Sequence, residues 1–303
     1  MRYFLENEIL KAEIDSKGAE LKSVLRKSDY REYMWYSSPR IWNRTSPILF
    51  PVVGGLTGKR FVIDGQEYPM GQHGFARDME FSPESKREVP EGSGCNEELW
   101  FILESNEETL KKYPFAFRLH LGYRLDGDKL AVMWRVENPA DDTMYFSIGA
   151  HPAFLCPVHG ENSKTGYRLF FEGCEQIRHY GNPDKSGLAS PDEDLVLDLS
   201  DERAVITEDF FDRCTYIITG GQTKKVGIED PEGKRIVTVS FDMPLFAIWS
   251  PEKKNAPFIC IEPWFGRCDA AGYTGEFKDR EYTQTLAGKE TFETQYTVQF
   301  HEV

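Results

Sequence analysis

The chain has 303 residues, 40% of them hydrophobic, and a formal net charge of −14 at pH 7. A strongly acidic chain repels nucleic-acid phosphates and anionic membrane surfaces, so these partners are excluded and a small neutral molecule is the expected partner. The length suits one large all-β domain, so residues 1–303 are expected to form a single domain. Composition leaves the oligomeric state open between a monomer and a homodimer.

The six cysteines are scattered without a C-x-x-C pair in a chain too large to need disulfides, so we expect reduced thiols. Acidic residues begin at Glu6, before an apolar signal core can form. No segment approaches the ~18 consecutive apolar residues that a membrane-spanning helix needs. These features predict a cytoplasmic protein.

Alternating apolar and polar residues predict β-strands along nearly the whole chain. The expected hairpins span 61–68, 115–136 and 226–239, and a closing strand spans 291–300. Each hairpin turns at a glycine-containing segment: Asp64-Gly65, Asp126-Gly127-Asp128 and Pro231-Glu232-Gly233. Short, regularly spaced strands with such turns predict an all-β sandwich or a barrel-like antiparallel sheet.

Helix signals occur in one place, from Asn106 to Tyr113. Ser105 or Asn106 can cap it, acidic residues come first, lysines come last, and Pro114 ends it. The polar, turn-rich stretches 88–98 and 180–194 predict surface loops.

Glu262 has an unusual setting for a charged residue. It follows the almost unbroken apolar run from Pro257 to Ile261, which is typical of a strand buried on both faces. Burial raises the pKa of a carboxyl group toward neutrality, and such a group accepts protons well at physiological pH. A buried glutamate paired with a structural arginine remains the alternative. The Pro263-Trp264 pair is expected to end the strand and to offer an aromatic face for a sugar ring, although a tryptophan taken alone is more often a core residue than a sugar platform.

Two histidines are framed by rigid backbone in a similar way. His151 follows the apolar segment from Met144 to Ile148 and lies between a glycine and a proline, and His73 lies in a glycine-bracketed segment with Arg77 four residues later. Imidazole exchanges protons near neutral pH, although each histidine could also be a satisfied structural residue. Arg77 could bind vicinal hydroxyls or a nearby carboxylate. Together, two imidazoles and one carboxylate beside aromatic rings favour acid/base chemistry on a sugar.

Other chemistries fit poorly. The segment Gly54 to Lys59 has the wrong spacing for a phosphate-binding loop, and Cys156 with His159 lacks two further zinc ligands at usable spacing. No G-x-G-x-x-G follows a predicted strand, and the antiparallel pattern leaves no βαβ unit for a dinucleotide. We therefore expect a catalyst that needs no metal and no cofactor.

Four segments, in this order and spread over most of the chain, carry a family resemblance. They are Ser46-Pro47-Ile48-Leu49-Phe50-Pro51, Gly71-Gln72-His73-Gly74-Phe75-Ala76-Arg77, His151-Pro152-Ala153-Phe154 and Cys260-Ile261-Glu262-Pro263-Trp264. The set resembles the aldose 1-epimerase (galactose mutarotase) family, in its shorter bacterial branch. The resemblance implies a galactose mutarotase-like β-sandwich of large antiparallel sheets, with very little helix and the site in the concave face of one sheet.

The resemblance also implies roles for individual residues. His151 falls on the family's general acid, which protonates the ring oxygen of an aldohexose such as galactose or glucose. Glu262 falls on the general base, which takes the proton from the anomeric hydroxyl. The remaining substrate-binding residues that it implies are His73, Arg44, Arg77, Trp264 and Asp212.

One departure from the family pattern concerns Asp212. Many relatives carry an aspartate at about the position of Cys214, where this chain offers Asp209 and Asp212 nearby instead. The sugar hydroxyls that are recognised therefore stay open.

Three alternatives to an aldohexose mutarotase remain. Because Arg44 and Arg77 could face a phosphate, a hexose-6-phosphate 1-epimerase is one of them. A non-catalytic carbohydrate-binding module is the second. A glycoside hydrolase or lyase is the third, and it would need a second carboxylate such as Asp242 or Glu229.

Overall fold

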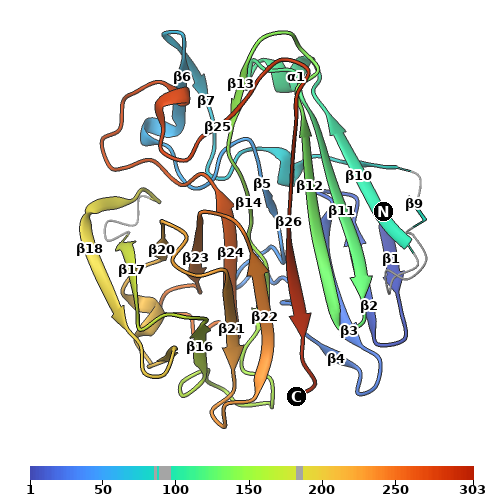
Figure 1. Cartoon of the computed structure of the whole chain (residues 1–303), viewed down its shortest axis with the longest axis vertical. Helices are drawn as coiled ribbons and strands as arrows, with labels where there is room; N and C mark the ends of the chain where they lie inside the picture. Colours follow the sequence, from blue (N-terminus) through green and yellow to red (C-terminus); the bar gives the residue numbers. More distant parts are fainter. Residues whose placement is uncertain (85–86, 89–96, 182–186) are drawn as a thin grey trace.

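The computed structural model describes residues 1–84, 87–88, 97–181 and 187–303. Two large antiparallel sheets dominate this part of the chain, which confirms the predicted all-β class (Figure 1). The larger sheet has the order β19 (Arg203–Val205), β16 (Arg168–Phe171), β21 (Lys225–Glu229), β22 (Arg235–Phe241), β26 (Thr291–Phe300), β12 (Lys129–Glu137), β11 (Arg118–Asp126), β10 (Glu97–Glu104) and β8 (Ser82–Pro83), and β9 (Arg87–Glu88) also pairs with β10.

The second sheet carries the residues of interest for function. Its order is β18 (Ser190–Asp198), β17 (Gln176–Gly181), β20 (Tyr216–Ile218), β23 (Leu245–Trp249), β24 (Phe258–Phe265), β14 (Ile148–Ala150) and β5 (Ile48–Leu49), and β15 (Ala153–Leu155) also pairs with β24. β24 therefore lies inside the sheet, with β23 on one side and both β14 and β15 on the other.

Smaller elements complete the described chain. A four-stranded sheet contains β1 (Arg2–Glu6), β2 (Leu10–Asp15), β3 (Glu20–Arg26) and β4 (Arg31–Glu32), and two ribbons pair β13 (Met144–Phe146) with β25 (Gln284–Leu286) and β6 (Arg60–Ile63) with β7 (Gln66–Pro69). The short helices are α1 (Glu107–Leu110), η1 (Thr57–Lys59), η2 (Ala76–Asp78), η3 (Phe210–Asp212) and η4 (Phe277–Asp279). Within the described residues, none of these helices is long and apolar enough to cross a membrane.

The predicted hairpins are confirmed. β11 and β12 pair from Arg118 opposite Glu137 to Asp126 opposite Lys129, around the expected turn, and β26 then pairs with β12 along its length. The side chains of β11 and β12 that alternate toward the interior join one large buried cluster with those of β22 and β26. Alternation along the chain thus identified the core-facing side of these strands.

Two local predictions need correction. The expected helix from Asn106 to Tyr113 shrinks to α1, although its cap is as predicted: the Asn106 side chain accepts the backbone N–H groups of Glu108 and Thr109, each at 3.0 Å. The expected loops at 88–98 and 180–194 contain strand residues of β9, β10, β17 and β18 at their ends. Their central parts, 89–96 and 182–186, lie outside the described residues.

The cysteines of the described chain are free thiols, and they are Cys156, Cys174, Cys214, Cys260 and Cys268. Cys95 lies outside the described residues.

Candidate active site

A cavity of about 440 Å³ lies over the second sheet. Its lining residues are Trp42, Asn43, Arg44, Gly54, Gln72, His73, Arg77, His151, Gly187, Thr215, Ile217, Trp249, Glu262, Trp264 and Cys268. The fold therefore brings together every residue that the sequence nominated for sugar chemistry except Asp212.

The register of β24 sets the relation between His151 and Glu262. β14 and β15 pair with β24 in one continuous register, interrupted only at His151-Pro152, and this register places His151 directly opposite Glu262. Residues opposite each other on neighbouring antiparallel strands point to the same face. Both side chains therefore project into the cavity from adjacent chain segments, and His151 Nε2 lies 3.3 Å from Glu262 Oε2.

Burial controls the protonation of this pair. Glu262 is 1% exposed, and this desolvation raises its carboxyl pKa well above the ordinary value. Burial, together with the positive charge of Arg77, lowers the pKa of His151 to about 3. Of the two groups, Glu262 therefore holds a proton more readily, and the His151 imidazole beside it is neutral.

Aromatic rings hold the His151 imidazole in place. The ring centroid of Trp42 lies 4.8 Å from that of His151 at an interplanar angle of 30°, and Trp249 contacts it edge-on at 5.3 Å. His73 makes a second edge-on contact at 5.6 Å. This packing fixes the orientation of the imidazole and keeps water from much of its surface.

His73 lies in a tight turn that fixes its tautomer. It has a positive φ of 65° and is followed by Gly74, where an added Cβ would lie 2.2 Å from the Phe50 carbonyl oxygen. His73 Nδ1 accepts the backbone N–H of Gly54 at 3.1 Å. Because burial keeps the pKa of His73 well below its usual value, the imidazole is neutral and its proton is on Nε2. His73 is therefore a hydrogen-bond donor at the cavity wall.

Two arginines share one carboxylate at the rim. Arg44 donates to Asp78 Oδ1 at 2.6 Å, whereas Arg77 Nε lies 4.0 Å from Asp78 Oδ2. Arg77 also donates to the Gln72 carbonyl at 2.7 Å, and its buried Nε has no hydrogen-bond partner in the described part of the chain. Burial and the neighbouring Arg44 lower the pKa of Arg77 to about 10. The rim thus carries more positive than negative charge.

The expectation that Pro263-Trp264 ends the strand is wrong, because β24 continues to Phe265. The register places Pro263 opposite Ala150, where proline has no N–H to donate. The indole Nε1–H of Trp264 donates to the Ala150 carbonyl instead, at 3.2 Å. Trp264 is therefore both a wall of the cavity and a replacement for the missing ladder bond next to His151.

Asp212 does not join the cavity. It ends η3, accepts the backbone N–H of Lys253 at 2.7 Å and lines a different cavity. From the same stretch of chain, Thr215 reaches the site instead. The structure does not place Asp212 where a sugar in this site could contact it.

The sequence patterns did not nominate several of the residues that line the cavity. They are Trp42, Asn43, Gln72, Thr215 and Trp249. Asn43 and Gln72 directly adjoin nominated residues, so adjacency was an available signal, whereas Trp42 and Trp249 resemble ordinary core tryptophans in sequence.

The sequence left two alternatives for carboxylates: a structural arginine pair for Glu262, and a second catalytic carboxylate at Glu229 or Asp242. The ionisable neighbour of Glu262 is the neutral imidazole of His151, and no arginine pairs with Glu262 among the described residues. Glu229 pairs with Arg203 at 2.7 Å in the larger sheet, and Asp242 forms an exposed pair with Lys224 at 2.6 Å. Neither lines the cavity, and its described lining residues include no carboxylate besides Glu262 that could serve a glycosidase.

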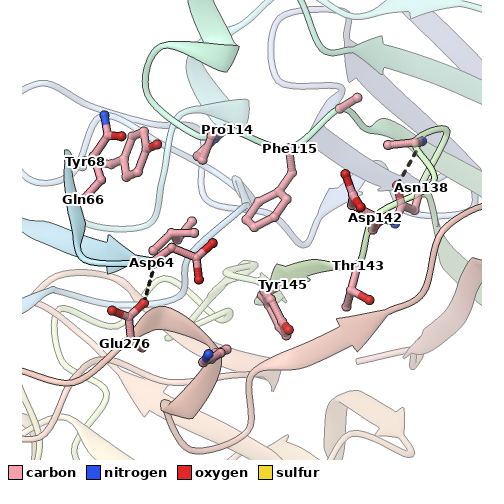
Figure 2. A pocket seen from close by; sticks show the side chains of 14 residues that line it. Asp64, Gln66, Tyr68, Pro114, Phe115, Asn138, Asp142, Thr143, Tyr145 and Glu276 are labelled. Carbon is pink, nitrogen blue, oxygen red and sulfur yellow. Dashed lines mark hydrogen bonds between the residues drawn. The ribbon is translucent and has the colours of Figure 1, made fainter.

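A second cavity, of about 520 Å³, lies between the β6–β7 ribbon and the segments around Phe115 and Tyr145. Figure 2 shows Phe115 near its centre, with Asp64 on one side and Asp142 on the other. Glu276, which also lines it, accepts the backbone N–H groups of Asp64 and Gly65 at 2.8 and 3.0 Å. No histidine is among its described lining residues, whereas His73, His151 and Glu262 all line the first cavity.

A model of the family described as aldose 1-epimerase matches residues 1–299. The chain belongs to the aldose 1-epimerase family.

Two solved structures support the fold of this aldose 1-epimerase family member. A galactose mutarotase related enzyme from Lactobacillus acidophilus is 31% identical with a TM-score of 0.90, over 100% of this chain and 98% of that chain. A galactose mutarotase-like protein from Lactobacillus casei is also 31% identical, with a TM-score of 0.89, over 99% of this chain and 100% of that chain. The galactose mutarotase-like fold implied by the four segments is thereby confirmed.

A relative is also known from Lactococcus lactis subsp. lactis. The plasmid-encoded protein LacX is 31% identical to this aldose 1-epimerase family member over 270 residues, which is 86% of this chain and 87% of LacX.

Proposed function

We propose that this protein is an aldose 1-epimerase that interconverts the α and β anomers of an aldohexose such as galactose or glucose. The observation that carries the proposal is the His151–Glu262 pair, 3.3 Å apart and buried in a cavity of about 440 Å³, in a member of this family. Two proton-transfer groups on adjacent strands suit a reaction that moves one proton away from a sugar oxygen and another toward it.

The reaction opens and recloses a hemiacetal. Glu262 takes the proton of the anomeric hydroxyl while His151 gives a proton to the ring oxygen, so the C1–O5 bond breaks and an open-chain aldehyde forms. Rotation about C1–C2 turns the other face of the carbonyl toward O5, and the ring closes with both proton transfers reversed. Acid/base help of ~10²- to 10⁴-fold is the usual contribution of such groups.

One proton must first change partners. These roles require an ionised Glu262 and a protonated His151, whereas burial favours a protonated Glu262 and a neutral His151. The two states contain the same number of protons, so moving one proton across the 3.3 Å gap interconverts them. Hydrogen bonds from sugar hydroxyls to the carboxylate would favour the ionised state, because they replace the solvation lost on burial.

The remaining cavity residues bind and orient the ring. His73 donates from Nε2, Arg44 and Arg77 donate to hydroxyl groups from the rim, and Trp264 forms an apolar wall. Such positioning adds to the rate because it holds C1 and O5 against the two proton-transfer groups.

Anomer exchange can be followed directly by polarimetry or exchange NMR on freshly dissolved α-D-glucose and α-D-galactose. We expect the wild type to accelerate exchange, and Glu262→Gln and His151→Asn to lose that acceleration. Asp242→Asn is a matched control, because it neutralises an exposed carboxylate outside the cavity. Sugar binding without any acceleration by the wild type would instead favour a non-catalytic carbohydrate-binding module.

The charge of the rim favours a second candidate, a hexose-6-phosphate 1-epimerase. Arg44 and Arg77 line the cavity, Glu262 is the carboxylate among the described lining residues, and Asp78 offsets only part of their charge. Arginine pairs well with phosphate. If glucose 6-phosphate is the substrate, Arg77→Gln will lower kcat/KM for it far more than for glucose; equal losses would favour the neutral sugar.

A further inference from the structure

A third potential metal ligand adjoins the His151–Glu262 pair. Cys260 precedes Glu262 by two residues on β24, so both side chains project from the same face of the sheet. One donor atom from each of Cys260, Glu262 and His151 lies within 4.8 Å of the others, and all three residues are buried. The spacing of residues along the sequence did not predict this cluster, because His151 is more than 100 positions away from Cys260 and Glu262.

Two polar atoms of the cluster lack partners. His151 Nδ1 and Glu262 Oε2 are buried, and neither has a hydrogen-bond partner among the described residues. A buried polar atom without a partner is costly, so a ligand that satisfies one of them is favoured. We propose that His151, Cys260 and Glu262 form a binding site for a thiophilic divalent cation such as Zn²⁺, and that the bound cation blocks the acid/base pair.

The donor set decides the class of cation. Imidazole, thiolate and carboxylate are all zinc ligands, whereas Mg²⁺ and Ca²⁺ select oxygen alone. A thiolate and a carboxylate together cancel two positive charges, so the bound site is neutral. Neutrality matters because the site is buried and because Arg77 lies close enough to lower the pKa of His151.

The geometry requires only small movements. Tetrahedral coordination at the usual Zn–N and Zn–S lengths separates ligand atoms by roughly 3.3–3.8 Å. The donors already lie within 4.8 Å, so small side-chain adjustments would close the cluster. His151 and Glu262 line the cavity, which leaves the fourth coordination position for water or a sugar hydroxyl.

Direct binding of zinc is the first test. Isothermal titration of the reduced full-length protein with ZnCl₂ should give one tight site, and titration with MgCl₂ should give none. Co²⁺ should produce a thiolate-to-cobalt charge-transfer band. Cys260→Ala should weaken zinc binding by about 100-fold or more and abolish this band, since loss of even outer-sphere support costs roughly 10- to 100-fold.

Matched variants locate the site. Cys174→Ala removes another buried cysteine that is not part of the cluster and should bind zinc as the wild type does. His151→Asn and Glu262→Gln should each weaken binding, which keeps the proposal testable if Cys260→Ala folds poorly. Zinc affinity that is unchanged in the folded variants of the cluster, or no binding by the wild type, would overturn the proposal.

The inhibitory part rests on the proposed function. For each active variant, the rate of anomer exchange with zinc is divided by its own rate without zinc. We expect zinc to reduce the wild-type ratio strongly and to leave the Cys260→Ala ratio close to one. Zinc binding by a protein that does not exchange anomers would refute the proposed mutarotase activity and support the zinc site. Anomer exchange by a protein that does not bind zinc would support the activity and refute the zinc site.

Discussion

The buried, neutral state of His151 predicts a specific dependence of stability on pH. In the unfolded chain the histidine pKa is 6.5, and in the folded protein burial and Arg77 lower it to about 3. Between these values the unfolded state binds a proton that the folded state rejects, so stability falls as the pH falls below 6.5. Each pH unit is worth about 1.4 kcal/mol, so the loss between pH 8 and pH 5 is about 2 kcal/mol.

His151→Asn removes this contribution, because asparagine does not titrate. Urea unfolding followed by tryptophan fluorescence at pH 8, 7, 6 and 5 gives the free energy of unfolding of both proteins. The variant also loses the ring contacts with Trp42 and Trp249, but that loss is a constant offset. The difference between wild type and variant should therefore shrink by about 2 kcal/mol from pH 8 to pH 5.

Glu262→Gln provides a companion test with the opposite sign. Burial raises the folded-state pKa of Glu262 above its ordinary value of 4.5, so the folded protein keeps a proton that the unfolded chain releases. The stability that the folded protein gains by holding this proton is fully present below pH 4.5 and is lost as the pH rises through the folded-state pKa of Glu262. The wild type should lose stability relative to the glutamine variant as the pH rises. Differences that stay constant with pH in both variants would refute the assignment of protons in this site.

Two further predictions concern packing and buried charge. Gly149→Ala would place a Cβ 2.5 Å from Trp264 Cδ1, so we expect overpacking to cost about 1–3 kcal/mol in urea unfolding and to slow anomer exchange; wild-type values for both would contradict this role of Gly149. Asp269→Asn breaks a 2.6 Å pair with Arg280 in which both side chains are at most 5% exposed, and should cost about 3–5 kcal/mol, whereas Asp242→Asn, in an exposed pair, should cost under about 1 kcal/mol. Similar losses for the two aspartates would show that burial does not control their contribution.

Local patterns in the sequence were sufficient for much of the fold. Alternation and glycine turns predicted a hairpin over 115–136, observed at 118–137, and the closing strand. They succeeded because side-chain period and turn geometry are properties of neighbouring residues. The apolar run before Glu262 likewise predicted a buried carboxylate. The predicted helix from Asn106 has the expected cap but ends at Leu110. The prediction of its length was wrong because a capping signal marks where a helix begins and not how far it extends.

The site itself depends on contacts between distant segments. The sequence nominated His151 and Glu262 separately, but only the common register of β14 and β15 on β24 places them opposite each other. The same register brings Cys260 to them, and tertiary packing sends Asp212 to another cavity. Strand register and chain crossings are set by the packing of the whole core, so they cannot be predicted from the spacing of residues along the sequence. The sequence by itself thus determined the strands and the chemical groups, and the tertiary structure decided which groups meet.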